Sequence, residues 1–373
     1  MTGPALHPTW AWLAALRDPA LALHWTLHDW ERVLRLSRRL RLLARLAASL
    51  DAAGLLASVP TPVLRHLVAE RRLSQWRTGA MVWLLDRVGA TLGGQGYALV
   101  LLKGAAYIGQ DLSIASGRLP ADVDILVPQL HLAQAQARLL AAGWAEIELD
   151  AHDSRYYREW SHEVPPMRHP LHRMELDLHH NILPPVAHVR VDAGLLLARL
   201  APSKWPAWQV LHPVDQVLHS ASHLFQDSEA RDRVRDLVDL DGLLRHFGQA
   251  PAFWAELPNR ACELGLAEPL ALACHFCVRW LGTPVPPDTL AHIASTGPGA
   301  LRQAWLLPML SSILTPAPAE QAPPWQQSMA AWVFLARYHR NRLPLRLLLP
   351  HLWHKLRRPA GLAVDAGVPE ARR

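Results

Sequence analysis

The sequence predicts an α+β fold in which a small mixed β-sheet lies between two helical regions. Apolar residues make up 50% and charged residues 19% of the 373-residue chain, a balance typical of a folded protein rather than a disordered one. The hydrophobic period is helical at first, alternates between strand and helix patterns in the middle, and is helical again afterwards. A chain of this length can form two or three domains with a core in each.

The N-terminal helical region, residues 1–92, is predicted to contain three helices. Residues 29–53 carry apolar side chains at helical spacing with arginines between them, and Pro60 and Pro62 end that pattern. A second helix is predicted over residues 63–73 and a third over 74–92, where Gly93 and Gly94 stop it.

The central region, residues 93–205, is predicted to form the sheet. Strands are predicted over residues 97–102, 122–127, 144–149 and 172–179, and helices over 105–112 and 129–142, with Gly143 in the C′ position. This order describes a compact α/β unit with a mixed sheet.

The remainder of the chain returns to helices. In the C-terminal helical region, residues 206–330, helices are predicted over 213–225 and 229–247, with one or two more within 251–281. Prolines interrupt residues 282–324, so only short helices are expected there. Residues 331–373 form a basic, proline-punctuated tail.

Cysteine use and hydropathy favour a cytoplasmic protein. The three cysteines, Cys262, Cys274 and Cys277, cannot form a disulfide framework, which favours a reducing compartment. Cys274 and Cys277 have redox or zinc spacing, but they lie in an apolar helical run without a second ligand pair, so buried structural thiols are predicted. No signal-peptide pattern is evident, and no apolar run reaches the roughly 18 residues of a membrane span.

Three aspartates on two predicted strands point to chemistry. Asp122 and Asp124 lie two residues apart in a strand, so their side chains share one face, roughly 6.6 Å apart. Two adjacent carboxylates repel each other, and a divalent metal is the simplest way to offset that cost. A later strand can supply Asp177 as a third carboxylate. The alternative is that Asp122 and Asp124 are solvated loop charges after Pro120, although the apolar residues that follow indicate a strand.

This carboxylate set is what metal-assisted phosphoryl or nucleotidyl transfer requires. In two-metal transfer, one ion activates the attacking oxygen and the other stabilises the leaving oxygen. Two Mg²⁺ ions suit carboxylates and substrate phosphates, with Mn²⁺ as the alternative metal. Lys103 and Gly104 lie where a strand ends and a helix begins, which favours an anion near the backbone. Lys103 and Arg118 are therefore predicted to neutralise a triphosphate.

The chain resembles the nucleotidyltransferase superfamily with the DNA polymerase β fold in the segments LLKGAAYIGQDL, GRLPADVDILVP and MELDLHHNI. More narrowly, it is similar to a poorly characterised bacterial nucleotidyltransferase family whose first strand ends Leu-Lys-Gly. In that family an arginine precedes Asp-x-Asp, and Asp-x-His follows later. The residues that match by position are Lys103, Gly104, Arg118, Asp122, Asp124, Asp177 and His179.

The resemblance implies a polymerase β-like catalytic core over residues 93–205 with helices on both sides. It implies a cytoplasmic enzyme of the EC 2.7.7 type that binds Mg-NTP, such as ATP, and moves the NMP group to an acceptor with release of pyrophosphate. Asp122 and Asp124 would hold both metals, and Asp177 would hold the catalytic one and help to deprotonate the acceptor. The acceptor, whether a small molecule, a peptide, a protein or an RNA, is left open.

Five further residues are candidates for the same pocket. Glu175 shares a strand face with Asp177 and could replace it as the third ligand. His179 could lie near the metals or bond to a backbone carbonyl. His219 and His223 have the i, i+4 spacing that can present two imidazoles to one metal, with a structural role as the alternative. Asp236 matches an Asp-rich helix of the family, and ordinary pairing with nearby arginines explains it as well.

Two other functions compete with catalysis. A relative without activity would bind nucleotide and act as a regulator or scaffold. A second possibility is an interaction protein, since the net charge of +6 favours anionic partners such as nucleic acid or acidic lipid. The arginine-rich helix near Arg38 and the basic residues after Arg337 are its candidate surfaces, although Pro344 and Pro350 favour docking of the latter on the protein itself.

Overall fold

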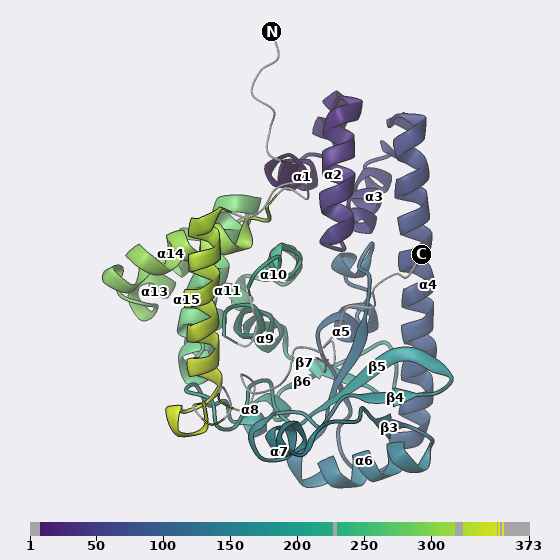
Figure 1. Ribbon diagram of the computed structural model, residues 1–373, viewed down its shortest axis with the longest axis vertical. Coiled ribbons are helices and arrows are strands. Elements are labelled where there is room, and N and C mark those ends of the chain that lie inside the picture. The colour runs from purple at the N-terminus through teal and green to yellow at the C-terminus, as the bar shows by residue number, and fades with distance from the viewer. Residues whose placement is uncertain (1–7, 227–229, 318–323, 349, 351–352, 354–373) are drawn as a thin grey trace.

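The computed structural model describes residues 8–226, 230–317, 324–348, 350 and 353. It is an α+β structure: a mixed sheet lies at the bottom of the view in Figure 1, and helices from both ends of the chain stand around and above it. The predicted fold class is confirmed. Among the described residues, no helix is long and apolar enough to cross a membrane.

The N-terminal helices are α1 (Pro8–Arg17), α2 (Leu27–Arg39), α3 (Leu43–Ala52) and α4 (Thr61–Leu92). The single pattern over residues 29–53 is two helices, because Arg41 adopts a positive φ of 57° and turns the chain between them. The two helices predicted over 63–73 and 74–92 are one continuous helix. Neither Leu73 nor Ser74 breaks a helix, and the Ser74 hydroxyl donates to the carbonyl of Arg118.

Helix α4 connects the two halves of the structure. It contacts α3 near one end and α6 (Leu132–Ala141) near the other, and it runs along one side of the molecule in Figure 1. Thr61 and Pro62 begin the helix, and Pro62 fits the first turn because that turn needs no donor.

The sheet has the strand order β3-β4-β5-β2-β1-β7-β6. Its strands are β1 (Val100–Leu101), β2 (Asp122–Leu126), β3 (Ala145–Glu146), β4 (Met167–His169), β5 (His172–His179), β6 (Leu200–Pro202) and β7 (Gln209–Leu211). The central pair, β2 and β5, is parallel, and β2 pairs with β1 in the antiparallel direction. β4, β6 and β7 have three residues each, too few for a clear alternation pattern.

The two faces of the central strands differ in chemistry. Val123 and Ile125 of β2 and Leu176 and Leu178 of β5 are fully buried in one apolar core. The alternate positions carry the acidic and imidazole side chains, because successive residues of a strand point to opposite faces. Helix α5 (Lys103–Gly109) directly follows β1. Helix α7 (Ala151–Trp160) lies between β3 and β4.

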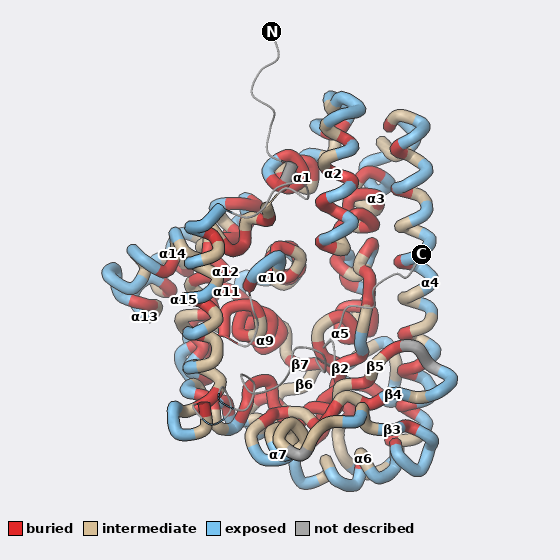
Figure 2. The backbone as a smooth tube through the Cα atoms, viewed as in Figure 1, coloured by how far each residue is buried: buried red, intermediate tan, exposed pale blue. Residues whose placement is uncertain are grey.

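The helices that follow β5 pack on one another and join the same apolar core as the strands. They are α8 (Ala193–Leu197), α9 (Pro213–Phe225), α10 (Val234–Phe247), α11 (Pro251–Glu263), α12 (Ala267–Phe276), α13 (Pro287–Thr296), α14 (Ala300–Leu314) and α15 (Trp325–Arg342). Nearly every residue of α9 is buried, and its ribbon is almost wholly red in Figure 2. Helix α14 has 15 residues in a segment predicted to hold only short helices, and it accommodates Pro308 internally.

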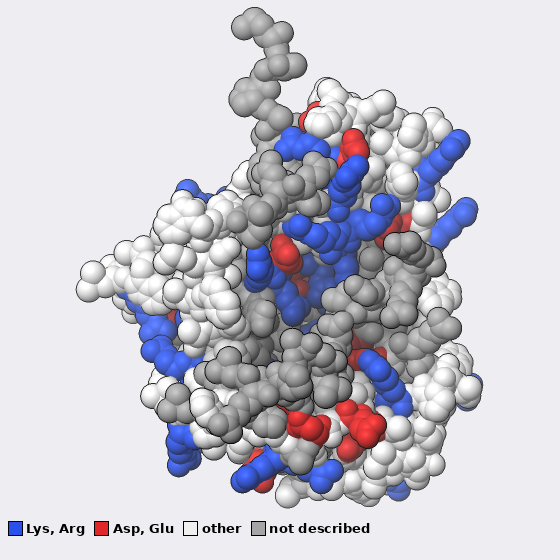
Figure 3. All heavy atoms as spheres, in the orientation of Figure 1, with Lys and Arg blue, Asp and Glu red and all other residues white. Residues whose placement is uncertain are grey.

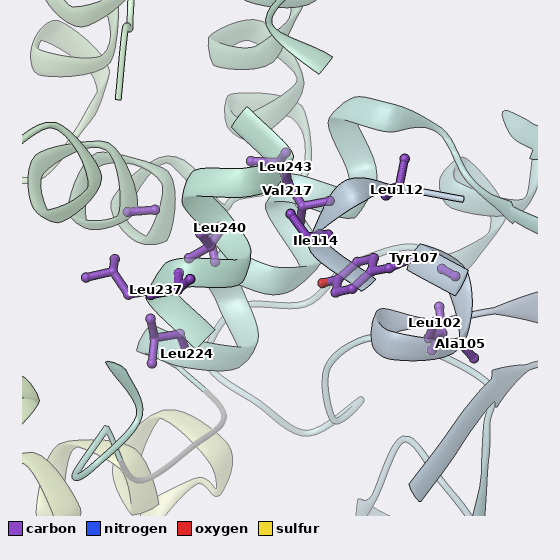
Figure 4. Close-up of a cluster of buried hydrophobic side chains, with 14 of the residues drawn as sticks. Leu102, Ala105, Tyr107, Leu112, Ile114, Val217, Leu224, Leu237, Leu240 and Leu243 are labelled. Carbon is purple, nitrogen blue, oxygen red and sulfur yellow. The ribbon is translucent and has the colours of Figure 1, made fainter. Parts of the chain in front are cut away.

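Apolar side chains join the sheet region to the C-terminal helices. Leu102, Tyr107 and Ile114 belong to the same buried cluster as Leu237 and Leu240 of α10 (Figure 4). Gly242 of α10 makes this packing close, since a Cβ there would overlap the Ile114 side chain. The cluster therefore fixes α10 against the segment that leads into β2.

Helix α15 crosses residue 330, where the sequence pattern suggested the start of the tail. It packs on α14, and Arg337 is buried, donating to the Phe225 carbonyl and pairing with Glu268. This basic residue therefore docks on the body of the protein. Residues 354–373 of the predicted tail lie outside the described residues.

Candidate active site

Two neighbouring strands bring the three predicted aspartates to one face of the sheet. In the parallel register of β2 and β5, Asp124 lies directly beside Asp177 and Asp122 lies beside Glu175. Directly paired residues of adjacent strands project to the same side. Asp122 is the only one of these that is exposed, whereas Asp124 is 5% exposed.

Two neighbouring side chains, Lys103 and His179, keep the Asp124 carboxyl group ionised. Lys103 Nζ lies 2.8 Å from Asp124 Oδ1, and His179 Nε2 lies 3.2 Å from the same oxygen. Burial by itself would raise the pKa of Asp124, but Lys103 and His179 outweigh it and hold that pKa well below its usual value. Asp124 is thus ionised at neutral pH.

Asp122 and Asp177 are in the opposite situation. Although Asp122 is exposed at its edge, the surrounding protein desolvates its carboxyl group, and this effect together with repulsion from Asp124 raises the pKa of Asp122. Burial, followed by repulsion from Glu163 and Asp124, raises the pKa of Asp177 well above its usual value. Asp177 Oδ1 is buried and has no hydrogen-bond partner. A divalent cation fits this set, since it would bind the unpartnered oxygen and remove the repulsion.

Lys103 begins α5 in a strained backbone conformation, with a φ of +43°. The side chain is held by Asp124, so its charge faces the carboxylates. Burial lowers the pKa of Lys103, but the attraction of Asp124 and Asp122 is stronger and raises that pKa overall. The predicted phosphate-binding lysine is therefore an ion-pair partner of the carboxylate site in this structure.

Gly104 makes room for Arg118. A Cβ at residue 104 would overlap the Arg118 guanidinium. That guanidinium is paired with Asp239 of α10 at 2.9 Å, and Arg45 of α3 pairs with the other oxygen of Asp239 at 3.1 Å. Arg118 also lies over the Tyr107 ring, 5.6 Å from its centroid. The arginine is thus held between α5 and α10.

Asp236, His223 and His219 approach the site from α9 and α10. A cavity is lined by Asp236 and His223 together with Lys103, Tyr107, Arg118, Asp122, Asp124, Ser220, Arg235 and Asp239. Burial would raise the pKa of Asp236, but Arg235 and Arg233 lower it overall. Burial, with repulsion from Lys103, lowers the pKa of His219 to about 3, so this imidazole is neutral.

Glu175 is turned outward to a different partner. It pairs with Arg168 of β4, whose side chain is 59% exposed. Asp177 rather than Glu175 therefore has the unpartnered oxygen next to Asp124.

Sequence reasoning missed His162 and Glu163, which follow α7. Glu163 forms an antiparallel bridge with His179, and Glu163 Oε2 lies 3.4 Å from His179 Nδ1. No regular element contains the two residues, and no spacing pattern links them to β5. Only a chain reversal, which leaves no local signature, brings them together.

Sequence reasoning also missed a group of arginines above the carboxylates, Arg41, Arg77, Arg233 and Arg235. Burial, followed by repulsion from Arg235 and Arg77, lowers the pKa of Arg41, while Asp122 partly offsets this. Figure 3 shows basic side chains gathered in the middle of the same face. Arg233 and Arg235 share Asp236, and Arg77 donates to the Pro120 carbonyl.

Comparison with known proteins gives one finding. A family model described as "uncharacterised nucleotidyltransferase" matches residues 26–282, which include every strand of the described residues and the helices from α2 to α12. No curated protein and no solved structure matches the chain.

Proposed function

The chain belongs to the uncharacterised nucleotidyltransferase family, and we propose that its carboxylate site moves an NMP group from a nucleoside triphosphate to an acceptor oxygen, releasing pyrophosphate. The reaction would be of the EC 2.7.7 type. The observation that carries this proposal is the register of β2 and β5, which sets Asp124 beside Asp177 with Asp122 two residues away on the same face.

The residues for metal binding are Asp122, Asp124 and Asp177. Mg²⁺ is the cation that this all-oxygen set favours, and it would supply charge neutralisation of the phosphates and activation of the attacking oxygen. The unpartnered Oδ1 of Asp177 supports this assignment. Asp177 would hold the catalytic ion and help to deprotonate the acceptor.

The basic residues above the carboxylates suit the triphosphate. Arg41, Arg77 and Arg235 come from the α2–α3 turn, α4 and α10, and Arg41 interacts electrostatically with the other two and with Asp122. Guanidinium groups bind phosphate oxygens through two parallel hydrogen bonds, which favours arginine at such a site. Lys103, Gly104 and Arg118 complete the predicted phosphate contacts if the nucleotide displaces Lys103 from Asp124.

The test is transfer of label from each of the four α-labelled NTPs in the presence of Mg²⁺ and a cell extract. The full chain should label one extract component and release pyrophosphate, whereas Asp124→Asn should lose at least about 100-fold in rate, as expected when a charge is removed from the reacting centre. The matched control is Asp86→Asn, an exposed carboxylate on α4, which should keep full activity. Equal activity of wild type and Asp124→Asn would overturn the proposal.

The Lys103–Asp124 ion pair favours a second candidate, a relative that binds nucleotide without turnover. An ammonium group 2.8 Å from the carboxylate already supplies positive charge where a metal would act. Such a protein would bind NTP, measured by calorimetry, and would release no pyrophosphate with any acceptor. Lys103→Met would then abolish NTP binding rather than change a rate.

A further inference from the structure

A buried group of two histidines and a glutamate lies behind the carboxylate site. His162, Glu163 and His179 each offer one ligand atom, and these atoms lie within 4.8 Å of one another. His162 is 5% and His179 3% exposed, and the Glu163 side chain is 18% exposed. The residues come from the segment after α7 and from the end of β5.

Backbone hydrogen bonds hold this group in place without help from its side chains. The Val164 amide donates to the Leu178 carbonyl at 3.0 Å, and the His180 amide donates to the His162 carbonyl at 2.8 Å. Glu163 and His179 are direct partners of an antiparallel bridge, so their side chains project together. The two imidazole rings are 5.3 Å apart between centroids. The three donors are therefore preorganised by the fold.

Each ring nitrogen of His179 lies near a carboxylate oxygen, and one of the two nitrogens has no suitable hydrogen-bond partner. Nε2 lies 3.2 Å from an oxygen of Asp124, and Nδ1 lies 3.4 Å from an oxygen of Glu163. A neutral imidazole has one N–H, so one of the two nitrogens presents a lone pair to a carboxylate. If Nε2–H donates to Asp124, the buried Nδ1 needs a positive partner, and it has no hydrogen bond in the structure.

We propose that His162, Glu163 and His179 form a separate site for a borderline divalent cation such as Zn²⁺, linked to the carboxylate site by the hydrogen bond from His179 to Asp124. Two imidazole nitrogens and one carboxylate oxygen are the ligand set of zinc and of other first-row metals rather than of Mg²⁺. A metal-bound imidazole whose other nitrogen donates to a carboxylate is a common arrangement, and it orients both groups. The metal here positions Asp124 through His179.

The proposal concerns metal binding, so it is tested on the full chain without any assay of nucleotidyl transfer. The protein is stripped with chelator, reloaded with Zn²⁺ or Co²⁺ without Mg²⁺, and analysed for metal content, for the Co²⁺ visible spectrum and by zinc X-ray absorption. Wild type should retain one ion, and the absorption data should show two imidazole ligands.

Two variants separate this site from its neighbours. Glu163→Gln keeps the shape of the side chain and should weaken Zn²⁺ binding at least about tenfold. The matched control His180→Ala removes an adjacent buried imidazole that donates to the Ser161 carbonyl but is not in the group, and this variant should bind the ion normally. Circular dichroism confirms folding, and the X-ray absorption of wild type reports the ligands even if a variant unfolds.

Three outcomes would overturn the proposal. The first is a wild-type protein that retains no Zn²⁺ or Co²⁺. The second is equal affinity of wild type and Glu163→Gln. The third is loss of the ion in Asp122→Asn but not in Glu163→Gln, which would place the ion among the aspartates. If the protein retained the ion but had no transferase activity, the result would support this metal site and would contradict only the proposed nucleotidyltransferase function.

Discussion

At the scale of single residues, a few contacts determine the charges and the packing of the candidate site. Gly104 illustrates this, because its missing side chain leaves the space that Arg118 occupies beside Asp239. Asp177 and Asp124, which are neighbours across β2 and β5, have pKa values shifted in opposite directions. Two predictions follow from these pairs.

Gly104→Ala should lower the free energy of unfolding by about 1–3 kcal/mol, because the new Cβ pushes a buried, paired guanidinium from its place. Urea unfolding measures the change. Gly79→Ala is the matched control, since a Cβ at this exposed position of α4 meets nothing within 4 Å. That variant should gain about 0.5–1 kcal/mol from helix propensity. Equal stabilisation of both variants would contradict the assignment of Arg118.

Asp177→Asn and Asp124→Asn should change stability in opposite directions in metal-free protein near pH 7. The pKa of Asp177 is raised on folding, so its charge costs stability as pH rises through that pKa, and Asp177→Asn should raise Tm by a few degrees. The pKa of Asp124 is lowered, so its charge contributes stability above the unfolded pKa, and Asp124→Asn should lower Tm.

Thermal unfolding between pH 4 and pH 8 tests these signs. The advantage of Asp177→Asn should shrink towards acid pH, where wild-type Asp177 is protonated in both states. The deficit of Asp124→Asn should persist until the pH falls below the unfolded pKa of roughly 4. Mg²⁺ should raise the Tm of wild type and leave that of Asp177→Asn nearly unchanged. Shifts of the same sign in both variants would sink this reading of the carboxylates.

At the scale of elements, ion pairs between helices hold the site-bearing segments together. Asp239 of α10 joins Arg45 of α3 to Arg118 of the loop before β2. A second pair, Arg260 of α11 with Asp215 of α9, is fully buried, with contacts of 2.8 and 2.9 Å. Helix α9 also carries His219 and His223 towards the cavity, so its position matters for the site.

Asp215→Ala should destabilise the protein by about 3–5 kcal/mol, because Arg260 would remain buried without its counter-charge. Glu263→Ala is the control within the same cluster. Glu263 contacts Arg260 at 2.8 Å, but its side chain is 49% exposed, so its loss should cost less than about 1 kcal/mol. Chemical denaturation measures the free energy of unfolding of both variants. Similar losses in the two variants would show that burial does not determine the cost of removing a partner of Arg260.

At the scale of the whole molecule, helices from both ends of the chain place arginines above a sheet that carries the carboxylates. The α2–α3 turn, α4 and α10 are far apart in sequence, yet Arg41, Arg77 and Arg235 influence one another electrostatically. A nucleotide seated there would therefore contact the N-terminal helices, the sheet and the C-terminal helices together. If so, nucleotide binding stabilises the whole assembly.

Arg41→Gln and Arg235→Gln should each raise the KM for NTP by about tenfold, equivalent to about 1.4 kcal/mol of binding, with a smaller change in kcat. The KM of wild type should also rise with salt, since exposed charges are screened. Arg71→Gln is the control, because Arg71 pairs with Asp51 at 2.7 Å on the surface. If the substitutions changed kcat but not KM, these arginines would not act in NTP binding.

The sequence determined the two central strands and the strand face that carries Asp122, Asp124 and Asp177, because these depend on neighbours in the chain. Alternation along residues 122–127 and 172–179 predicted β2 and β5 to within one residue. The helix predicted over residues 213–225 has the same bounds in the structure. Periodicity also predicted a helix break at 73–74 that does not exist, since amphipathic pattern changes do not by themselves end a helix.

Tertiary structure alone decided which charges meet. Lys103 and Asp124 are 21 residues apart, Arg118 and Asp239 are 121 apart, and Glu163 reaches His179 through a reversal after α7. Such pairings depend on the free energy of the packed chain, in which buried charges must find counter-charges, and no local pattern records which partner is found. The aspartates could therefore be predicted from the sequence, whereas the groups that tune them could not.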